Sequence, residues 1–462
     1  MTSTFNIRDF GAIGDGVAND ARPIQAAVNA AHERGGGTVL VPGGATFLSG
    51  SIVLKSNVEL HVERGAILQA SGKWEDITER HSVTALSSGV TTDGWEQSGI
   101  FIAAYEATNV AISGAGTVDG GGRHYVLEDL GPIYRMPINR PFTVFFIGCT
   151  DVVLTETMYR DGALWTIRLS GCESVHIQGI RIRGDMKLPN ADGIDIDRCR
   201  NVRISDCDIR CPDDAISLKT CEEFPQYGAC ENITVTNCVL ESRSSALVVG
   251  VDAMAPIRNV IFSGCVIVNS HRGLSVNLGQ NALYENILFS DIVVETRVFD
   301  DRWWGRGEPI YVSAFPWQDD IGRIRNVRFV NILARGESGV HISAVRSGLI
   351  DGVLLDNVRV EVDRWGDVEG GFVDRRPFSG EPKIFASPIS AFHIDHASNV
   401  SMHNCEAAWG SNLQDYFAHA LEAVDVDGLR VDGFIGEAAF AGVAAEHVRR
   451  GEMSVAGVIS RA

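Results

Sequence analysis

Three aspartates at short spacing are the residues of this chain best suited to chemistry. Asp192 lies in Asn190-Ala191-Asp192-Gly193, and Asp213 and Asp214 are adjacent 21 and 22 residues further on. This spacing is close to the period of the repeat described next, so the three carboxylates are expected on one face of neighbouring layers. Neighbouring carboxylates resist simultaneous ionisation, so one can remain an acid while the others polarise a water. That set of groups suits hydrolysis of a glycosidic bond.

An adjacent Asp-Asp pair places a condition on the backbone. Successive side chains of a strand point to opposite faces, so a bend or bulge is expected at Asp213 and Asp214 if both reach one cleft. The alternative reading is an acidic turn that binds Ca²⁺ or is simply solvated.

The chain contains a repeat that would position these residues. Segments of the form Asn-(Val/Ile)-x-apolar begin at Asn201, Asn232, Asn259, Asn286 and Asn326, with fainter copies at Ser174 and Asn399. The asparagines from 201 to 326 follow one another at 31, 27, 27 and 40 residues. Periods of this size are typical of solenoids, and the short alternating β-branched runs predict strands. The expected fold is therefore all-β, a single-stranded right-handed parallel β-helix, with Asn at a turn that favours left-handed backbone.

A solenoid lengthens by adding coils, so the sequence predicts one domain over residues 1–462. Residues 1–45 are expected to cap its first coil. Asp20 is a candidate N-cap of a short helix whose apolar stripe is Ile24, Ala27, Val28 and Ala31. Segments near 300–318 and 363–387 make their repeats longer than the others. They predict long loops, where binding residues usually lie.

Composition limits the partners. The formal net charge of −19 argues against nucleic acid and anionic membranes, which need basic surface, and a short or neutral sugar chain is easier to accept than a long polyanion. The first nine residues lack the basic and apolar regions of a signal peptide, and no apolar run has transmembrane length. A cytoplasmic location is therefore expected.

The ten cysteines predict buried thiols in place of a disulfide framework. Cys207, Cys238 and Cys265 occupy the same place in successive repeats, so they are expected to stack inside the coil as small hydrophobes. A local bridge among Cys211, Cys221 and Cys230 stays open. No paired Cys-x-x-Cys spacing indicates zinc, and no metal or other cofactor is expected.

The chain resembles the polygalacturonases of glycoside hydrolase family 28. The resemblance is carried by residues 10–27, 164–167, 190–195 and 213–219, which include all three aspartates. It implies a parallel β-helix that cleaves pectic oligosaccharides, derived from galacturonan or rhamnogalacturonan, with inversion at the anomeric carbon. By resemblance, Asp214 is the general acid, and Asp192 and Asp213 hold and activate the attacking water. Asn190 and Lys219, within or beside the same motifs, are expected to contact substrate.

Two departures from the family pattern concern the uronate. Ser245 stands where the family usually has the His of Gly-His-Gly, and Arg272-Gly273-Leu274 stands where it usually has Arg-Ile-Lys. Those basic residues help to grip the galacturonate carboxylate in the family, a task that two cations perform better than one. Arg272 is retained as a substrate-ligand candidate, and its neighbour His271 is either a partial replacement or a turn histidine of no special role.

The expected loop near residue 300 adds further candidates. Trp303 and Trp304 form a sugar-stacking wall in one reading, with Arg306 as a carboxylate clamp, and pin the loop to the coil in the other. Long loops that close one end of a cleft favour an exo-acting enzyme on imported oligosaccharides.

Other classes of protein stay open. A β-helix lyase would use Ca²⁺ and a basic residue, a fructan or neutral-sugar glycosidase or transferase would need no uronate grip, and a carbohydrate-binding solenoid would bind without turnover. The oligomeric state is also open, with a homodimer as one possibility.

Overall fold

The computed structural model describes residues 3–81, 98–137, 139–317 and 320–456. The protein is nearly all-β, with 54% strand and 6% helix, and its strands pair in parallel from coil to coil. The predicted right-handed parallel β-helix is confirmed. Contacts divide the chain into two compact units, residues 1–216 with 221–228 and residues 217–220 with 229–462. The single domain over residues 1–462 stays a prediction.

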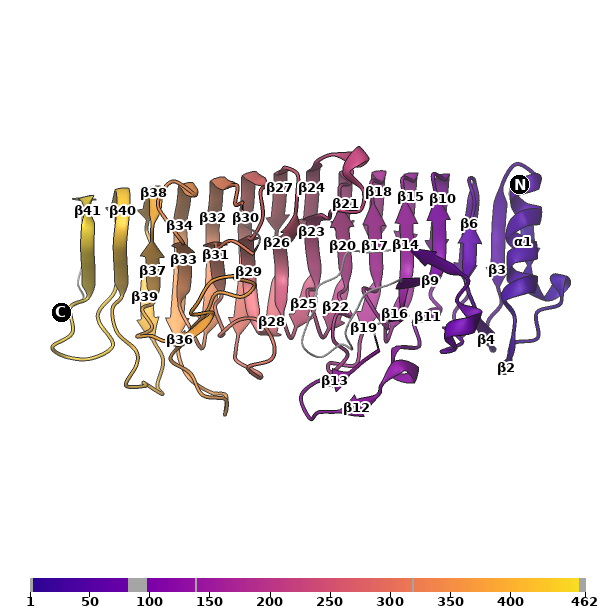
Figure 1. Cartoon of the computed structure of the whole chain (residues 1–462), viewed down its shortest axis with the longest axis horizontal. Coiled ribbons are helices and arrows are strands. Elements are labelled where there is room, and N and C mark those ends of the chain that lie inside the picture. Colours follow the sequence, from indigo (N-terminus) through magenta and orange to yellow (C-terminus); the bar gives the residue numbers. More distant parts are fainter. Residues whose placement is uncertain (1–2, 82–97, 138, 318–319, 457–462) are drawn as a thin grey trace. The chain divides into compact units, whose positions relative to one another are not determined.

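The strands of the first unit, many of which are labelled in Figure 1, form three series that each pair in parallel from coil to coil. The first series pairs β1 (Thr4–Asn6), β3 (Gly37–Val41), β6 (Val58–Val62), β10 (Thr108–Ser113), β15 (Thr150–Thr155), β18 (Glu173–Gln178) and β21 (Arg200–Ser205). The second pairs β2 (Asp15–Asn19), β4 (Thr46–Ser49), β7 (Ile67–Ala70), β11 (Thr117–Asp119), β16 (Met158–Arg160), β19 (Arg181–Arg183) and β22 (Asp208–Cys211). The third pairs β5 (Ile52–Leu54), β9 (Ser98–Tyr105), β14 (Pro141–Ile147), β17 (Ile167–Ser170) and β20 (Ile194–Asp197).

The second unit is built on the same plan. Its first series of strands is β24 (Cys230–Thr236), β27 (Ile257–Ser263), β30 (Leu283–Thr296), β32 (Arg323–Gly336), β34 (Ile350–Val362), β38 (Ala397–His403), β40 (Leu421–Asp432) and β41 (Glu446–Ala456). A second series is β26 (Ser245–Ala253), β29 (Arg272–Leu278), β31 (Ile310–Ala314), β33 (Val340–Ala344) and β37 (Phe392–Asp395). Shorter strands β25 (Val239–Ser242), β28 (Val266–Ser270) and β39 (Glu406–Trp409) flank them.

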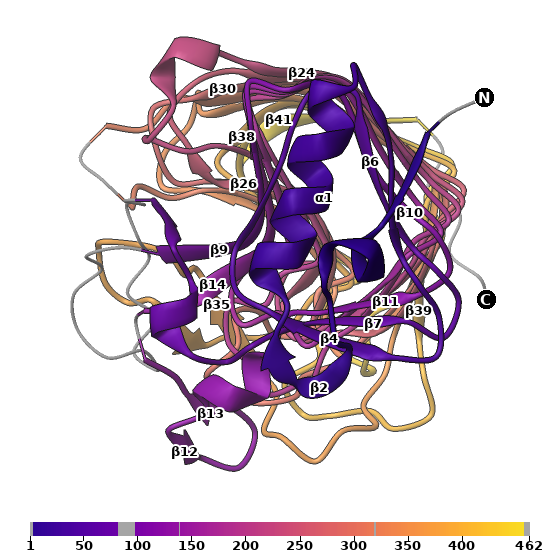
Figure 2. The ribbon, with the colours of Figure 1, turned by 90° about the vertical axis from the view of Figure 1, so that its right-hand side faces the viewer.

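The predicted helix is α1 (Ala21–Glu33), and it lies across the open end of the first coils (Figure 2). Its buried residues are the four predicted for the stripe: Ile24, Ala27, Val28 and Ala31. Asp20 occupies the N-cap position, but its side chain makes no cap bond to the helix. Its carboxylate instead accepts hydrogen bonds from the backbone N–H groups of Ile13 and Gly14, at 2.7 and 2.9 Å. Asp20 thereby ties the preceding loop to the start of the helix.

The repeated asparagines have left-handed backbone, as predicted. Ser174 and the six asparagines of the repeat have φ between 52° and 61°. In the second unit their side-chain amides form a ladder. Asn259 donates to Asn232 (3.1 Å), Asn286 to Asn259 (3.2 Å) and Asn326 to Asn286 (2.8 Å). Each coil therefore satisfies the turn polar groups of the next.

All ten cysteines lie in the described ranges, and all are free and buried. The predicted interior thiols are confirmed, and the bridge left open among Cys211, Cys221 and Cys230 does not form. In the first unit the sulfur of Cys199 accepts a bond from the backbone of Cys172 (3.3 Å), which extends the stacking to cysteines that the repeat pattern had not singled out.

Two long connections of the second unit overlap the predicted segments 300–318 and 363–387, although residues 310–314 form β31 and residue 318 lies outside the described residues. Residues 297–309 connect β30 to β31, and residues 363–391 connect β34 to β37 and include the antiparallel pair β35 (Phe372–Asp374) and β36 (Ile384–Ala386). A third excursion, over residues 120–140 of the first unit, was not predicted. It carries the short antiparallel pair β12 (Glu128–Asp129) and β13 (Tyr134–Arg135) and projects from the coils in Figure 1.

Candidate active site

The three predicted aspartates meet in the first unit. One carboxylate oxygen from each of Asp192, Asp213 and Asp214 lies within 4.8 Å of one from each of the others. Asp192 precedes β20, and the other two lie in the connection that follows β22. The backbone N–H of Gly193 donates to the carbonyl of Asp214 (2.8 Å), so Asp192 lies beside Asp214 on adjacent coils. The prediction that the sequence spacing corresponds to one layer is confirmed.

The expected bend is present at Pro212 and Asp213, between β22 and the next strand. Asp213 accepts hydrogen bonds from two backbone N–H groups, that of Asn190 to Oδ2 and that of Asp214 to Oδ1, both at 3.1 Å. Such donors favour the ionised form of a carboxylate. Asn190 has a φ of 57°, a left-handed conformation that asparagine tolerates better than most residues.

A glycine follows Asp192 for a steric reason. A Cβ on Gly193 would lie 2.3 Å from the carbonyl oxygen of Ala215 on the next coil. Any larger residue would push the two backbones apart where the carboxylates converge. The position of Asp192 therefore depends on its neighbour being glycine.

Arg140 is a component of this site that the sequence reasoning missed. Its side chain is 0% exposed, and it donates to the carbonyls of Ala163 (3.0 Å) and Pro189 (2.7 Å) and to Oδ1 of Asn190 (2.8 Å). Burial lowers the pKa of Arg140 to about 9, against the opposing attraction of Asp213 and Asp192. It therefore remains a cation at neutral pH. The available signal was a charged residue directly before the apolar strand Pro141–Ile147.

The coil before Asp192 is aromatic. The backbone N–H of Thr166 donates to the carbonyl of Asp192 (2.9 Å), which places Trp165 next to Asp192. Trp165 is buried and packs edge-on against Phe142 with ring centroids 5.8 Å apart. The guanidinium of Arg168 lies 4.9 Å from the Trp165 ring. This row gives the aspartates a rigid apolar flank.

The excursion over residues 120–140 borders the same site. Its Tyr125 and Met136 form a buried cluster with Leu188 and Ala191, the residue before Asp192. The Tyr134 N–H also donates to the carbonyl of Lys187 (2.8 Å). The excursion thus covers the connection that carries Asp192.

Within the described part of the chain, the three aspartates form the one group whose oxygens converge closely enough to hold a cation. Ca²⁺ takes about six to eight oxygens, so waters or other groups would have to supply ligands beside these three side chains. The buried positive charge of Arg140 beside them also disfavours a cation. The set fits a polarised water better than a metal ion.

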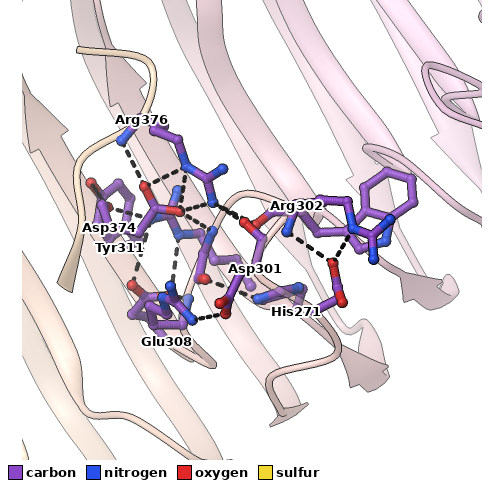
Figure 3. Close-up of polar contacts among 12 residues, drawn as sticks. His271, Asp301, Arg302, Glu308, Tyr311, Asp374 and Arg376 are labelled. Atoms are coloured by element: carbon purple, nitrogen blue, oxygen red, sulfur yellow. Dashed lines mark hydrogen bonds and ion pairs between the residues drawn. The ribbon is translucent and has the colours of Figure 1, made fainter. Parts of the chain in front are cut away.

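The candidates of the second unit form a different arrangement (Figure 3). Ser245 pairs in register with Arg272, as expected for equivalent positions on adjacent coils. Arg272 is 1% exposed and donates to Glu308 through Nε (3.2 Å) and Nη2 (3.5 Å). Nη2 also donates to the Asp374 carbonyl (2.8 Å), and the guanidinium lies 3.5 Å from the centre of the Tyr311 ring. Contact between Arg272 and a substrate would require this pair to open, so its role as a ligand stays a prediction.

Asp374 joins the two long loops of the second unit. Its carboxylate binds the Arg376 guanidinium (2.7 Å) and accepts from the backbone N–H of Gly305 (2.9 Å). Burial alone would raise the pKa of Asp374, but Arg376 outweighs burial and lowers it. His271 is held by the same loop, with Nε2 2.9 Å from the Gly305 carbonyl. Burial and the charge of Arg272 lower the pKa of His271 to about 3, so it is neutral at physiological pH.

The remaining candidates of the second unit differ in exposure. Trp303 is 5% exposed, and its carbonyl accepts a hydrogen bond from the Arg376 guanidinium (2.8 Å). Trp304 is half-buried and keeps surface on which a sugar could stack. Arg306 is buried and donates to Asp301 (2.5 Å). Lys219 is also buried. Their contacts with substrate stay predictions.

A parallel β-helix whose coil connections bring three carboxylates together defines the general class of this protein. Comparison with known protein families assigns the chain to one family within that class. The sequence pattern of "Glycosyl hydrolases family 28" matches residues 37–298, and the chain belongs to this family. The family predicted from the aspartate motifs is thereby confirmed.

Individual relatives agree with the family. A probable polygalacturonase of Vitis vinifera is 32% identical over 228 residues, which are 48% of this chain and 44% of that protein. The chain thus spans less than half the length of this relative. A hyperthermoactive exopolygalacturonase of Thermotoga maritima superimposes with a TM-score of 0.61 at 21% identity, over 99% of this chain and 91% of that one. A polygalacturonase of Erwinia carotovora gives 0.59 at 17% identity, over 90% and 96%. At these identities the two structures show the fold alone. Among the described residues, no helix is both long and apolar enough to cross a membrane.

Proposed function

We propose that the protein is a glycoside hydrolase that removes sugars from the ends of pectic oligosaccharides with inversion of configuration. The observation that carries this proposal is the meeting of Asp192, Asp213 and Asp214 within 4.8 Å in a family 28 chain. Asp214 is the general acid that protonates the leaving oxygen. Asp192 and Asp213 hold the attacking water and take its proton.

The contacts of Asp213 support the division of roles. Its two backbone N–H donors favour the charged form, which is the form that accepts a proton from water. Hydrogen bonds to water are about 2.8 Å long, so two oxygens less than 5 Å apart can bind one water together. Asp192, on the adjacent coil, provides the second oxygen.

The spacing of the carboxylates sets up a test of the stereochemistry. Inverting pairs usually stand about 6.5–9.5 Å apart and retaining pairs about 5–5.5 Å, which is nearer to the cluster described here. The inverting proposal rests on the third carboxylate, because a retaining enzyme needs only an acid and a nucleophile. A product of retained configuration would overturn it.

The exo-acting and pectic parts of the proposal rest on relatives and on loops. The structural neighbours include exopolygalacturonases of Thermotoga maritima and Yersinia enterocolitica. The excursion over residues 120–140 supplies a wall next to Asp192. We also propose that the enzyme works in the cytoplasm, where ten free cysteines would stay reduced. Its substrates would then be imported oligosaccharides.

A neutral sugar is the second candidate substrate, and one observation favours it. The guanidinium of Arg272 is already bound by the carboxylate of Glu308, so it is not poised to grip a uronate. Ser245, which pairs in register with Arg272, stands in place of a histidine. Neither of these two positions therefore presents an unpaired cation to a galacturonate. A neutral residue such as rhamnose needs none.

Product analysis by NMR on a panel of pectic and neutral oligosaccharides tests both candidates. The wild type should release a sugar of inverted configuration from chain ends, and Asp214→Asn should lose about 10²- to 10⁴-fold in kcat. Asp208→Asn is the matched control, because Asp208 lies in the same unit, is half-exposed and pairs only with Arg183 among the contacts described. It should keep full activity. Unsaturated products would establish a lyase, mid-length products an endo-acting enzyme, and binding without turnover a carbohydrate-binding solenoid.

A further inference from the structure

The connection that carries Asp192 is held at two points. It runs from β19 to β20, and near its start the Asp185 N–H donates to Asp161 (2.8 Å). Arg123 bridges both carboxylates at 3.0 and 3.2 Å, with its side chain 66% exposed. This first point lies at the surface, where an ion pair contributes little to stability.

The second point of attachment is Arg140, and it is buried. The guanidinium fixes the Pro189 carbonyl and the Asn190 side chain, the two residues that precede Ala191 and Asp192. Asn190 in turn donates its backbone N–H to Asp213. One buried cation therefore connects the peptide before Asp192 to the carboxylate of Asp213 on the next coil.

We propose that Arg140 is a positioning residue of the active site. It holds the end of the Asp192 connection in place, and its buried charge offsets the repulsion among three crowded carboxylates. The inference rests on the proposed function only in assigning catalysis to that cluster. Arg140 is fully buried, so it acts through Asn190 and through its field and not by touching the sugar.

The charges that face Arg140 give the expected direction of its effect. Asp192 and Asp213 act on it directly, and Asp214 and Asp195 belong to the same acidic surroundings, which also contain the Cys211 thiol. Burial raises the pKa of Cys211 well above its usual range, so that thiol carries no charge. Loss of the Arg140 charge would remove a buried cation that acts on Asp213 and Asp192, so the carboxylates would hold protons to higher pH.

The kinetic test compares Arg140→Met and Arg140→Lys with two controls. Arg140→Met should lower kcat by about 100-fold with little change in KM, since misplacing catalytic groups by about 1 Å has that effect. The acidic and basic limbs of its kcat–pH profile should both move to higher pH by about one unit or more. Arg140→Lys keeps the positive charge but loses the planar guanidinium that binds Pro189 and Asn190 together. It should therefore lower kcat and leave both limbs of the pH profile in place. Arg123→Met, at the surface attachment, and Arg160→Met, at a half-exposed arginine of this unit that pairs with Asp119, should keep the wild-type pH profile. Wild-type limbs in Arg140→Met would overturn the proposal.

A second measurement needs no turnover and therefore separates this inference from the proposed function. Thermal unfolding at pH 7 is compared for the wild type, Arg140→Met, Asp213→Asn and the double variant. If Arg140 offsets the carboxylate charge, the double variant should lose less in Tm than the two single losses added together. Strict additivity would mean that Arg140 and Asp213 are not coupled, and would refute the positioning role even if the enzyme proves inactive on every sugar. Arg140→Gln, which also removes the charge, replaces Arg140→Met in the same cycle if the latter does not fold.

Discussion

Removal of the Glu308 carboxylate provides a quantitative test of the arrangement in the second unit. In Glu308→Ala the Arg272 guanidinium would lose both of its bonds to this carboxylate while remaining buried, with side chains 1% and 3% exposed in the native pair. Breaking one partner of a buried pair costs about 3–5 kcal/mol. The Asp374 carbonyl and the Tyr311 ring still face Arg272, so the lower figure, about 3 kcal/mol, is expected. At about 2–4 °C per kcal/mol for a unit of this size, Tm should fall by about 6–12 °C.

Differential scanning calorimetry of four proteins measures this effect. Replacing both partners by apolar residues, in Arg272→Met with Glu308→Leu, should recover most of the loss, because no buried charge is then left without a partner. Glu381→Ala is the control, since its pair with Lys383 is exposed, and it should change Tm by about 2 °C at most. A Glu308→Ala protein as stable as the control, or a double variant less stable than the single, would refute the account of Arg272 as a buried, satisfied ion pair.

Three further outcomes are expected. Burial keeps the pKa of His341 well below its ordinary value, so the unfolded chain takes up a proton first as pH falls below about 6.5, and stability decreases. In His341→Phe, the fall in Tm between pH 7 and pH 5 should be smaller than in the wild type. Gly193→Ala should lower kcat by about 100-fold without loss of β structure by circular dichroism, because its Cβ meets the Ala215 carbonyl at 2.3 Å. Asp20→Ala should cost about 1–3 kcal/mol and speed hydrogen exchange at the two amides it binds.

Each of these expectations has a contrary result. An equal pH slope in His341→Phe would mean that this histidine is not kept neutral by burial. Full activity in Gly193→Ala would show that the adjoining coil yields without moving Asp192. Unchanged exchange in Asp20→Ala would show that the loop before the helix is held by other contacts.

The coil, the capping helix and the aspartate cluster could be predicted because each depends on local pattern and period. Asn232 and Asn259 mark the same turn on neighbouring coils, and this fixes which strands pair. Once the coils are stacked, Asp192 and Asp214 must lie side by side, whatever the loops do. The stripe of α1 followed from helical spacing alone.

Contacts between residues far apart in sequence could not be predicted in this way. Arg140 reaches Asn190 across 50 residues, and Arg272 reaches the Asp374 carbonyl across 102. No period relates these positions, so their pairing depends on the paths of loops that the repeat does not encode. The same limit explains why Glu308 was not foreseen as the partner of Arg272. The excursion over residues 120–140 was missed because it lies outside the repeat that was followed.

The asparagine ladder has a consequence for how this protein can change over evolutionary time. Asn259 and Asn286 are 27 residues apart and Asn286 and Asn326 are 40 apart, yet both pairs close the same amide bond. Most of the additional residues leave the coil in the connection 297–309, and β32 resumes in register with β30. Loop length is therefore free to drift while the scaffold stays constant, which would let a lineage alter the sugars it accepts without rebuilding the strands that hold its carboxylates.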